Sequence, residues 1–200
     1  MAGRSPLVVL VSGAPGSGKS TLASALSAEL ELPYLNKDSL VHGVWRTQRR
    51  AFELGVVGVE LFYATMEFWL SKGVSFVVDQ TFVRGVSEPD VGSRIKPRCE
   101  LVNVHCYSPD ATERWERRML SGQLCGQQRL AKLHPMVERL QQELSDPLDF
   151  GCLTIVVSTA DSYRPSLREI TLAINDNYGY PTVHELDKPA APSQRESGPQ

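Results

Sequence analysis

Residues 13–20 read Gly13-Ala14-Pro15-Gly16-Ser17-Gly18-Lys19-Ser20 and are followed by Thr21, which fits the pattern G-x-x-x-x-G-K-S. A polyphosphate needs several backbone N–H donors that converge on its oxygens, and glycines leave the backbone open to that approach. The Lys19 ammonium can reach the terminal phosphates, and the Ser20 hydroxyl can bind Mg²⁺. The stretch therefore predicts a loop that binds the phosphates of a nucleotide such as ATP, with Mg²⁺.

The sequence on either side of this loop agrees with that prediction. Residues 7–11 form a wholly apolar run, which is typical of a buried parallel strand. After the loop, Leu22, Leu26 and Leu30 recur every four residues, as on the apolar face of a helix. A helix that starts at Lys19 would also point its positive dipole end at the bound anion. The alternative is a glycine-rich turn between strand and helix that binds nothing.

Composition and charge narrow the class of protein. The chain has 200 residues, 42% of them hydrophobic, which suits one α/β domain with a small lid. A net charge of −2 gives no general attraction to nucleic acid or membranes, and no apolar run approaches membrane-spanning length. The four cysteines have no metal-binding spacing, which favours free thiols in a reducing cytoplasm. We expect a domain over residues 1–180 and a disordered tail over 181–200.

The remaining apolar runs alternate with helical patterns along the chain. Further strands are predicted at residues 33–36, 74–79, 101–107 and 153–157. Helices are predicted at residues 39–52, 56–72, from Ser108 onward with Ser108 as its N-cap, at 136–144 and at 165–175. Residues 84–98 contain two prolines and are expected to be loop with one short helix. The order predicts a three-layer α/β fold with a five-stranded parallel sheet, flanking helices and a lid over about residues 110–135.

Two aspartates follow predicted strands, so they should face the ligand at the carboxyl edge of the sheet. Asp79 ends the run at 74–79, where an acidic side chain can help Ser20 to hold Mg²⁺. Asp38 follows the strand at 33–36 and could accept the proton of an attacking hydroxyl. The alternatives are a turn-starting residue for Asp79 and a helix N-cap for Asp38.

Three arginines, Arg114, Arg117 and Arg118, lie three and four residues apart and share one face of a predicted helix. Guanidinium groups placed in this way can stabilise phosphate oxygens during phosphoryl transfer. The alternative is a solvated face that pairs with Glu113 and Glu116. For the acceptor pocket, the candidates between the second and third strands are Trp45, Arg46 and Arg49, since such pockets mix aromatic walls with a few polar groups.

The segments VSGAPGSGKSTLA, LNKDSL and VVDQTF, together with the later E-R-x-x-R-R helix, resemble the small P-loop kinases. That group includes the zeta-toxin-like enzymes, chloramphenicol phosphotransferase, gluconate kinase and the kinase domain of polynucleotide kinase. The resemblance covers about residues 5–177 and implies a helical lid that closes over ATP. It also implies roles for individual residues: Asp38 as the acceptor-side base, Arg114 and Arg118 as lid arginines, Gln80 and Thr81 beside Asp79 in the segment after the third strand, and Ser158 and Thr159 in the adenine-contacting loop.

The residues and the resemblance together predict an ATP-dependent phosphotransferase that acts on a hydroxyl of a sugar, nucleoside or antibiotic-like alcohol. The alternatives are a polynucleotide 5′-kinase, a zeta-toxin-like nucleotide-sugar kinase, and a GTP switch or non-catalytic nucleotide-binding module. The chain departs from the family at residues 84–98 and 121–132, so the acceptor stays open. We expect a monomer or homodimer that acts on small molecules, without nucleic-acid or membrane partners.

Overall fold

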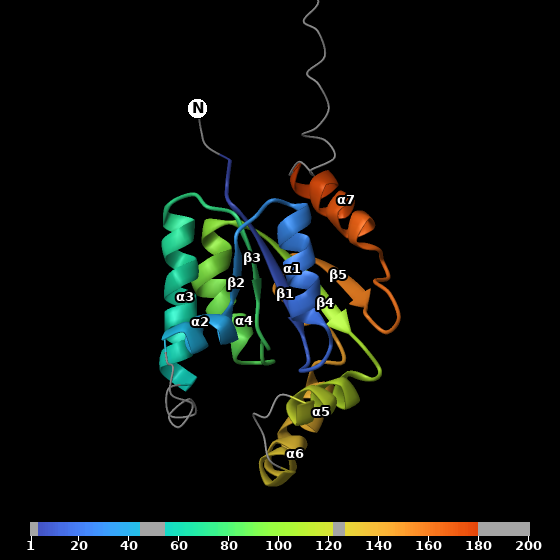
Figure 1. Cartoon of the computed structure of the whole chain (residues 1–200). Coiled ribbons are helices and arrows are strands. Elements are labelled where there is room, and N and C mark those ends of the chain that lie inside the picture. Colours follow the sequence, from blue (N-terminus) through green and yellow to red (C-terminus); the bar gives the residue numbers. More distant parts are fainter. Residues whose placement is uncertain (1–3, 45–54, 122–126, 180–200) are drawn as a thin grey trace, which may run out of the picture.

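The computed structural model describes residues 4–44, 55–121 and 127–179. Its centre is a five-stranded parallel sheet in the order β2-β3-β1-β4-β5 (Figure 1). The strands are β1 (Leu7–Gly13), β2 (Tyr34–Asn36), β3 (Phe76–Asp79), β4 (Glu100–Tyr107) and β5 (Leu153–Ser158). The sequence therefore predicted all five strands and the parallel sheet correctly.

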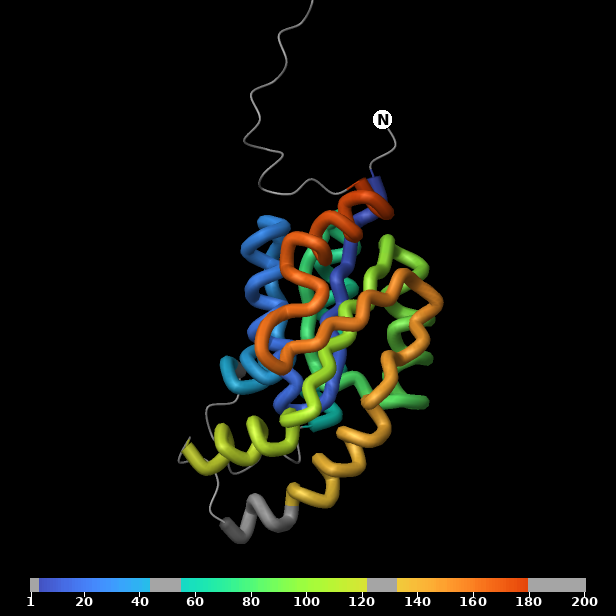
Figure 2. The backbone as a smooth tube through the Cα atoms, turned by 90° about the vertical axis from the view of Figure 1, so that its right-hand side faces the viewer, coloured from blue at the N-terminus to red at the C-terminus, as the bar shows by residue number. Residues whose placement is uncertain are grey.

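Helices lie on both faces of the sheet and beyond one of its ends. They are α1 (Lys19–Glu29), α2 (Lys37–Val44), α3 (Gly55–Ser71), α4 (Ser87–Asp90), α5 (Ala111–Ser121), α6 (Gln127–Glu143) and α7 (Leu167–Tyr178). Figures 1 and 2 show α5 and α6 together beyond the end of the sheet where α1 begins, which is the carboxyl end of the strands. None of the helices in the described residues combines the length and apolar character that a bilayer crossing requires.

The alternation of side chains along β1 creates two hydrophobic cores. Val8 and Leu10 join the core that α3 and the segment after α4 cover, whereas Leu7, Val9 and Val11 join the core under α1 and α7. Both faces of a strand inside a doubly covered parallel sheet are buried, which explains why residues 7–11 are continuously apolar. The three-layer α/β prediction is thus confirmed.

Residues 84–98 differ from the prediction of a loop with one short helix. Helix α4 continues without a break into a π-helical turn (Val91–Ile95) and a 3-10 turn (Lys96–Arg98). Pro89 lies in the first turn of α4 and Pro97 at the start of the 3-10 turn, positions in which a missing N–H is tolerated. Val91 and Ile95 are four residues apart and both buried, so one apolar helix face holds the segment on the core.

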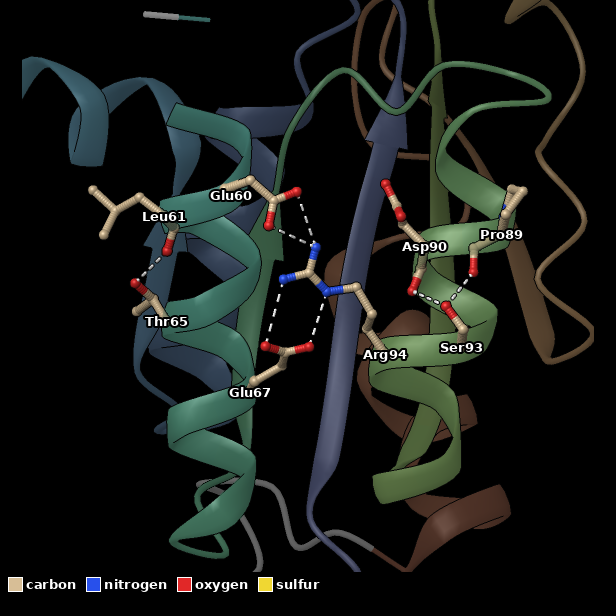
Figure 3. A network of polar contacts seen from close by, with 8 residues as sticks. All are labelled: Glu60, Leu61, Thr65, Glu67, Pro89, Asp90, Ser93 and Arg94. Carbon is tan, nitrogen blue, oxygen red and sulfur yellow. Dashed lines mark hydrogen bonds and ion pairs between the residues drawn. The ribbon is translucent and has the colours of Figure 1, made fainter. Parts of the chain in front are cut away.

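Arg94 in this segment ties it to α3 (Figure 3). Its Nε lies 2.9 Å from Oε1 of Glu67, and its Nη1 lies 3.1 Å from Oε2 of Glu60. The guanidinium carbon is 4.7 Å from the centroid of the Tyr63 ring, in a cation–π arrangement. The hydrogen bond from Arg94 holds the pKa of the Glu67 carboxyl below its ordinary value. This ion-pair cluster joins two helices on the same face of the sheet.

Three helix boundaries also differ from the prediction. Helix α5 begins at Ala111 rather than at Ser108, because the carbonyl of Asp110 accepts the first helical hydrogen bond, from the Arg114 N–H. Helix α6 begins at Gln127 rather than at residue 136 and contains Pro135. Helix α7 begins at Leu167, and Ser166 and Glu169 form a capping box. The proposed tail, residues 181–200, and the second half of the helix predicted at 39–52 lie outside the described residues.

Candidate nucleotide and acceptor site

The loop between β1 and α1 has the conformation that its glycines allow. Gly16 and Gly18 both have a φ of 84°, a backbone angle that residues with a side chain rarely adopt. Two hydrogen bonds from distant segments fix the loop: Thr159 Oγ1 donates to the Ser17 carbonyl over 2.6 Å, and Gln141 Nε2 donates to the Pro15 carbonyl over 2.6 Å. The loop is therefore held from both the β5 side and the α6 side.

Lys19 is the first residue of α1, directly after the loop. Burial lowers the pKa of its ammonium, while the carboxylates of Asp79 and Asp38 act in the opposite direction. Among the described residues, Lys19 forms no ion pair within 4 Å. A desolvated cation without a close counterion favours an incoming anion, so this position suits a phosphate group.

The Asp79 carboxylate is fully buried at the end of β3 and accepts three hydrogen bonds. The Ser20 hydroxyl donates to Oδ2 over 2.6 Å. The Tyr34 hydroxyl and the Asn36 amide donate to Oδ1 over 2.6 Å and 2.7 Å. Burial and the bond to Asp79 raise the pKa of Tyr34, so its hydroxyl stays protonated and remains a donor. Ser20 and Asp79, predicted as a pair from sequence, are in direct contact.

This arrangement fits a magnesium ion. Ser20 uses its only hydrogen toward Asp79, which leaves the lone pairs of its oxygen free for a cation. Within the described residues, no group of three or more His, Cys, Asp or Glu side chains could hold a metal by itself. Mg²⁺ commonly binds through one or two protein oxygens together with waters and phosphates, so a hydroxyl and one carboxylate beside the loop suit it.

A cavity of about 440 Å³ opens beside Ser20 and Asp38. Its lining residues are Ser20, Thr21, Tyr34, Asn36, Asp38, Ser39 and Arg118. The Asp38 side chain is 77% exposed and pairs with Lys37 at 3.6 Å. The N-cap of α2 is Asn36, whose Oδ1 accepts from the Ser39 N–H over 2.7 Å, so Asp38 is not needed as the cap. The carboxylate of Asp38 is thus available to a ligand in this cavity.

A second cavity of about 440 Å³ lies on the other side of Thr21. Its lining residues are Gly18, Thr21, Arg114, Thr159, Asp161, Ser162 and Tyr163. Both cavities are lined by Thr21 in the first turn of α1, and Gly18 of the loop lines the second, so a nucleotide with its phosphates on the loop could place its base in the second cavity. Thr159 lines it, as expected of the segment after β5, whereas Ser158 is not among its lining residues.

The structure separates the three arginines of α5. Arg114 donates to the carbonyls of Thr159 and Ala160 and to Asp110, which places its guanidinium at the second cavity. Arg117 pairs with Glu113 at 2.6 Å and is 72% exposed, as the solvated-face alternative expects. Arg118 lines the cavity of Asp38, and its charge further lowers the pKa of Lys19. Of the three, Arg118 is therefore the one beside the phosphate position.

Two of the other predicted site residues, Gln80 and Thr81, lie outside the linings of these cavities. Gln80 is buried after β3. The predicted pocket residues Trp45, Arg46 and Arg49 lie outside the described residues.

Sequence reasoning assigned no role to Tyr34. Tyr34 and Asn36 are two residues apart on a strand, so they share one side of it. That spacing was the available signal that both side chains point the same way, whereas their contact with Asp79 also requires β2 to lie beside β3.

Solved structures share this fold at low sequence identity. A protein from Chloroflexus aurantiacus J-10-fl, described as a candidate kinase, has a TM-score of 0.71 and 22% identity, over 86% of this chain and 98% of that one. A gluconokinase from Sinorhizobium meliloti 1021 has a TM-score of 0.58 and 17% identity, over 88% and 96%. A shikimate kinase from Acinetobacter baumannii, in complex with shikimate, has a TM-score of 0.53 and 18% identity, over 86% and 94%. These likenesses establish the fold of P-loop kinases.

No curated protein sequence matches this chain significantly. The model of one protein family does match it, over residues 8–123, which include the phosphate loop, Asp38, Asp79 and the three arginines of α5. That model, AAA_33, is described as an AAA domain and covers more than half of the chain. The protein therefore belongs to the AAA_33 family.

Proposed function

We propose that the protein transfers the γ-phosphate of Mg-ATP to a hydroxyl of a small molecule. The observation that carries the proposal is one cavity in which Ser20, Asp38 and Arg118 face the same space beside Lys19. Phosphoryl transfer needs a phosphate-binding cation, a magnesium site, a proton acceptor for the attacking hydroxyl and positive charge at the transferred group. Lys19, the Ser20–Asp79 pair, Asp38 and Arg118 are the candidates for these four roles.

The roles follow from the placement of each group. The N–H groups of residues 13–21 and the Lys19 ammonium would bind the phosphates, and Arg114, Thr159 and the second cavity would bind adenine and ribose. Ser20 and Asp79 would hold Mg²⁺, which neutralises charge on the β- and γ-phosphates when bound. Asp38 would orient the acceptor hydroxyl and take its proton, and Arg118 would stabilise the transferred phosphoryl group.

The test begins with ATP consumption in the presence of sugars, nucleosides, antibiotic-like alcohols and an oligonucleotide with a free 5′-hydroxyl. Product formation with a small alcohol supports the proposal. Product formation only with the oligonucleotide would favour a polynucleotide 5′-kinase instead. Equal binding of GTP and ATP without transfer to any acceptor would favour a non-catalytic module.

Asp38→Asn then tests the mechanism. The variant keeps the size and part of the hydrogen bonding of Asp38 but cannot accept a proton. We expect ATP affinity near that of the parent and transfer reduced by roughly 10²-fold or more. Asp79→Asn is the matched comparison, since it should impair Mg-dependent nucleotide binding itself. Calorimetry and product formation are measured on the same samples, and normal transfer by Asp38→Asn would refute the role of Asp38.

A further inference from the structure

Asn36 makes two hydrogen bonds, one to Asp79 and one to the first turn of α2. Its Nδ2 donates to Oδ1 of Asp79 over 2.7 Å, and its Oδ1 accepts from the Ser39 N–H over 2.7 Å. The first bond reaches the candidate magnesium site, and the second holds the first turn of α2, which carries Asp38. One amide group therefore joins the nucleotide side of the cavity to its acceptor side.

The hydrogen bonds of Asp79 divide between its two carboxylate oxygens. Tyr34 and Asn36 both donate to Oδ1 from β2, whereas Ser20 donates to Oδ2 from α1. One carboxylate oxygen is therefore fixed to the edge strand and the other faces the phosphate loop. Tyr34 holds the same oxygen as Asn36 but lines the cavity without forming the N-cap of α2.

We propose that Asn36 is a positioning residue that couples the Asp79 magnesium site to the acceptor helix α2, so that nucleotide binding orders the turn that carries Asp38. This inference rests on the proposed function, because it takes Ser20 and Asp79 as the residues that hold Mg²⁺. An amide suits the position because it can donate and accept at the same time, whereas a carboxylate here would meet that of Asp79 without a donor.

Two substitutions separate this coupling from a merely structural role. Serine caps helices about as well as asparagine, so Asn36→Ser retains the cap, but its short side chain loses the bond to Asp79. Tyr34→Phe loses a different bond to the same Asp79 oxygen and leaves the cap and its link to Asp79 intact. Asn36→Ala removes both functions of the amide and reports the contribution of the cap alone when compared with Asn36→Ser.

The experiment uses AMP-PNP, a non-hydrolysable ATP analogue, with and without Mg²⁺. Calorimetry measures how much Mg²⁺ strengthens binding, and hydrogen exchange measures the protection of the amides of residues 37–44. In the parent we expect Mg²⁺ with AMP-PNP to slow exchange in α2. In Asn36→Ser we expect a thermal stability lowered about as much as in Tyr34→Phe, since each loses one bond to the same Asp79 oxygen, together with about tenfold less enhancement by Mg²⁺ and no added protection of α2. In Tyr34→Phe the enhancement should fall while the added protection remains.

The outcomes distinguish this inference from the proposed function. If Asn36→Ser matches the parent in both Mg²⁺ enhancement and α2 protection, Asn36 is only a helix cap and the coupling is refuted. If Tyr34→Phe also abolishes the protection of α2, the coupling does not run through Asn36. If the parent protein does not bind AMP-PNP with Mg²⁺, the proposed function fails, and the inference fails with it.

Discussion

Replacement of Gly16 by alanine should loosen the contact between the phosphate loop and the base of α5. A Cβ atom on Gly16 would overlap the carbonyl oxygen of Ala111, and it would lie 2.9 Å from the Ala111 carbonyl carbon and 3.1 Å from Trp115 Cβ. These are backbone atoms and the first atom of a side chain, so rotation of a flexible group cannot relieve the overlap. Either the loop or the start of α5 must move.

Gly18→Ala supplies the matched control. Gly18 has the same φ of 84°, but its added Cβ would meet nothing closer than Thr159 Oγ1 at 3.3 Å. Both variants carry the cost of a left-handed backbone, roughly 1–2 kcal/mol. Only Gly16→Ala adds steric overlap, which typically costs about 1–3 kcal/mol in a well-packed region. We expect Gly18→Ala to lower the free energy of unfolding by about 1–2 kcal/mol, and Gly16→Ala by about 2–5 kcal/mol.

Urea denaturation measures both stabilities, and calorimetry with AMP-PNP measures nucleotide affinity. Hydrogen exchange adds a local readout, because faster exchange in residues 111–121 is expected for Gly16→Ala and not for Gly18→Ala. Equal stability of the two variants, with unchanged exchange in α5, would refute the argument. It would mean that the Ala111 carbonyl does not restrain the loop in solution.

Lys19→Ala should keep the fold but sharply weaken ATP binding, because it removes the charge at the phosphate position; parental affinity in calorimetry would contradict the loop assignment. Arg118→Ala should lower turnover more than ATP affinity, and Arg117→Ala should change neither, since Arg117 is exposed and paired with Glu113. Equal effects of the two substitutions on turnover would show that Arg118, like Arg117, is only a solvent-facing residue. Arg94→Met should lower the free energy of unfolding by about 1–2 kcal/mol in urea, since it removes the partner of Glu67. Arg94 lowers the folded-state pKa of Glu67, so the difference in unfolding free energy between the parent and Arg94→Met is fully present above the ordinary pKa of 4.5 and should shrink as the pH falls below it. A difference in unfolding free energy that stays constant down to pH 3 would exclude the ion pair as its source.

The sequence was sufficient for the central strands β1 and β3 because their apolar runs are buried on both faces of the sheet. The edge strands β2 and β5 are only partly buried, and their apolar residues still marked them as strands. The prediction from sequence was wrong at residues 84–98, where Pro89 and Pro97 suggested a loop with one short helix. The buried pair Val91 and Ile95, at helical spacing, outweighed the prolines, which lie in the first turn of α4 and at the start of the 3-10 turn, where a missing N–H is tolerated. The helix-breaking tendency of proline was therefore a misleading guide here, because burial of the apolar face determined the conformation.

The site was predictable where it depends on sequence-local geometry and not where it depends on strand order. Lys19 and Ser20 are fixed by the loop motif, and Asp79 follows from its place at the end of a strand. The contacts of Asp79 with Tyr34 and Asn36 require β2 to lie beside β3, an adjacency that no residue pattern reveals. The same limit applies to Arg114 and Arg118, since only the position of α5 against β5 and α1 shows which of them lines the cavity of Asp38.

The packing of α5 and α6 also limits how a lid over residues 110–135 could move. The start of α5 packs on the loop through Ala111 and Trp115, which are both buried. The C-terminal half of α6 contributes Leu140 to the main core and is bonded to the Pro15 carbonyl through Gln141. Both ends contact the loop between β1 and α1, so neither can move without disturbing it. Arg118, seven residues into α5 from Ala111, is farther from this packed end than Arg114, whose guanidinium is hydrogen-bonded to the carbonyls of residues 159 and 160.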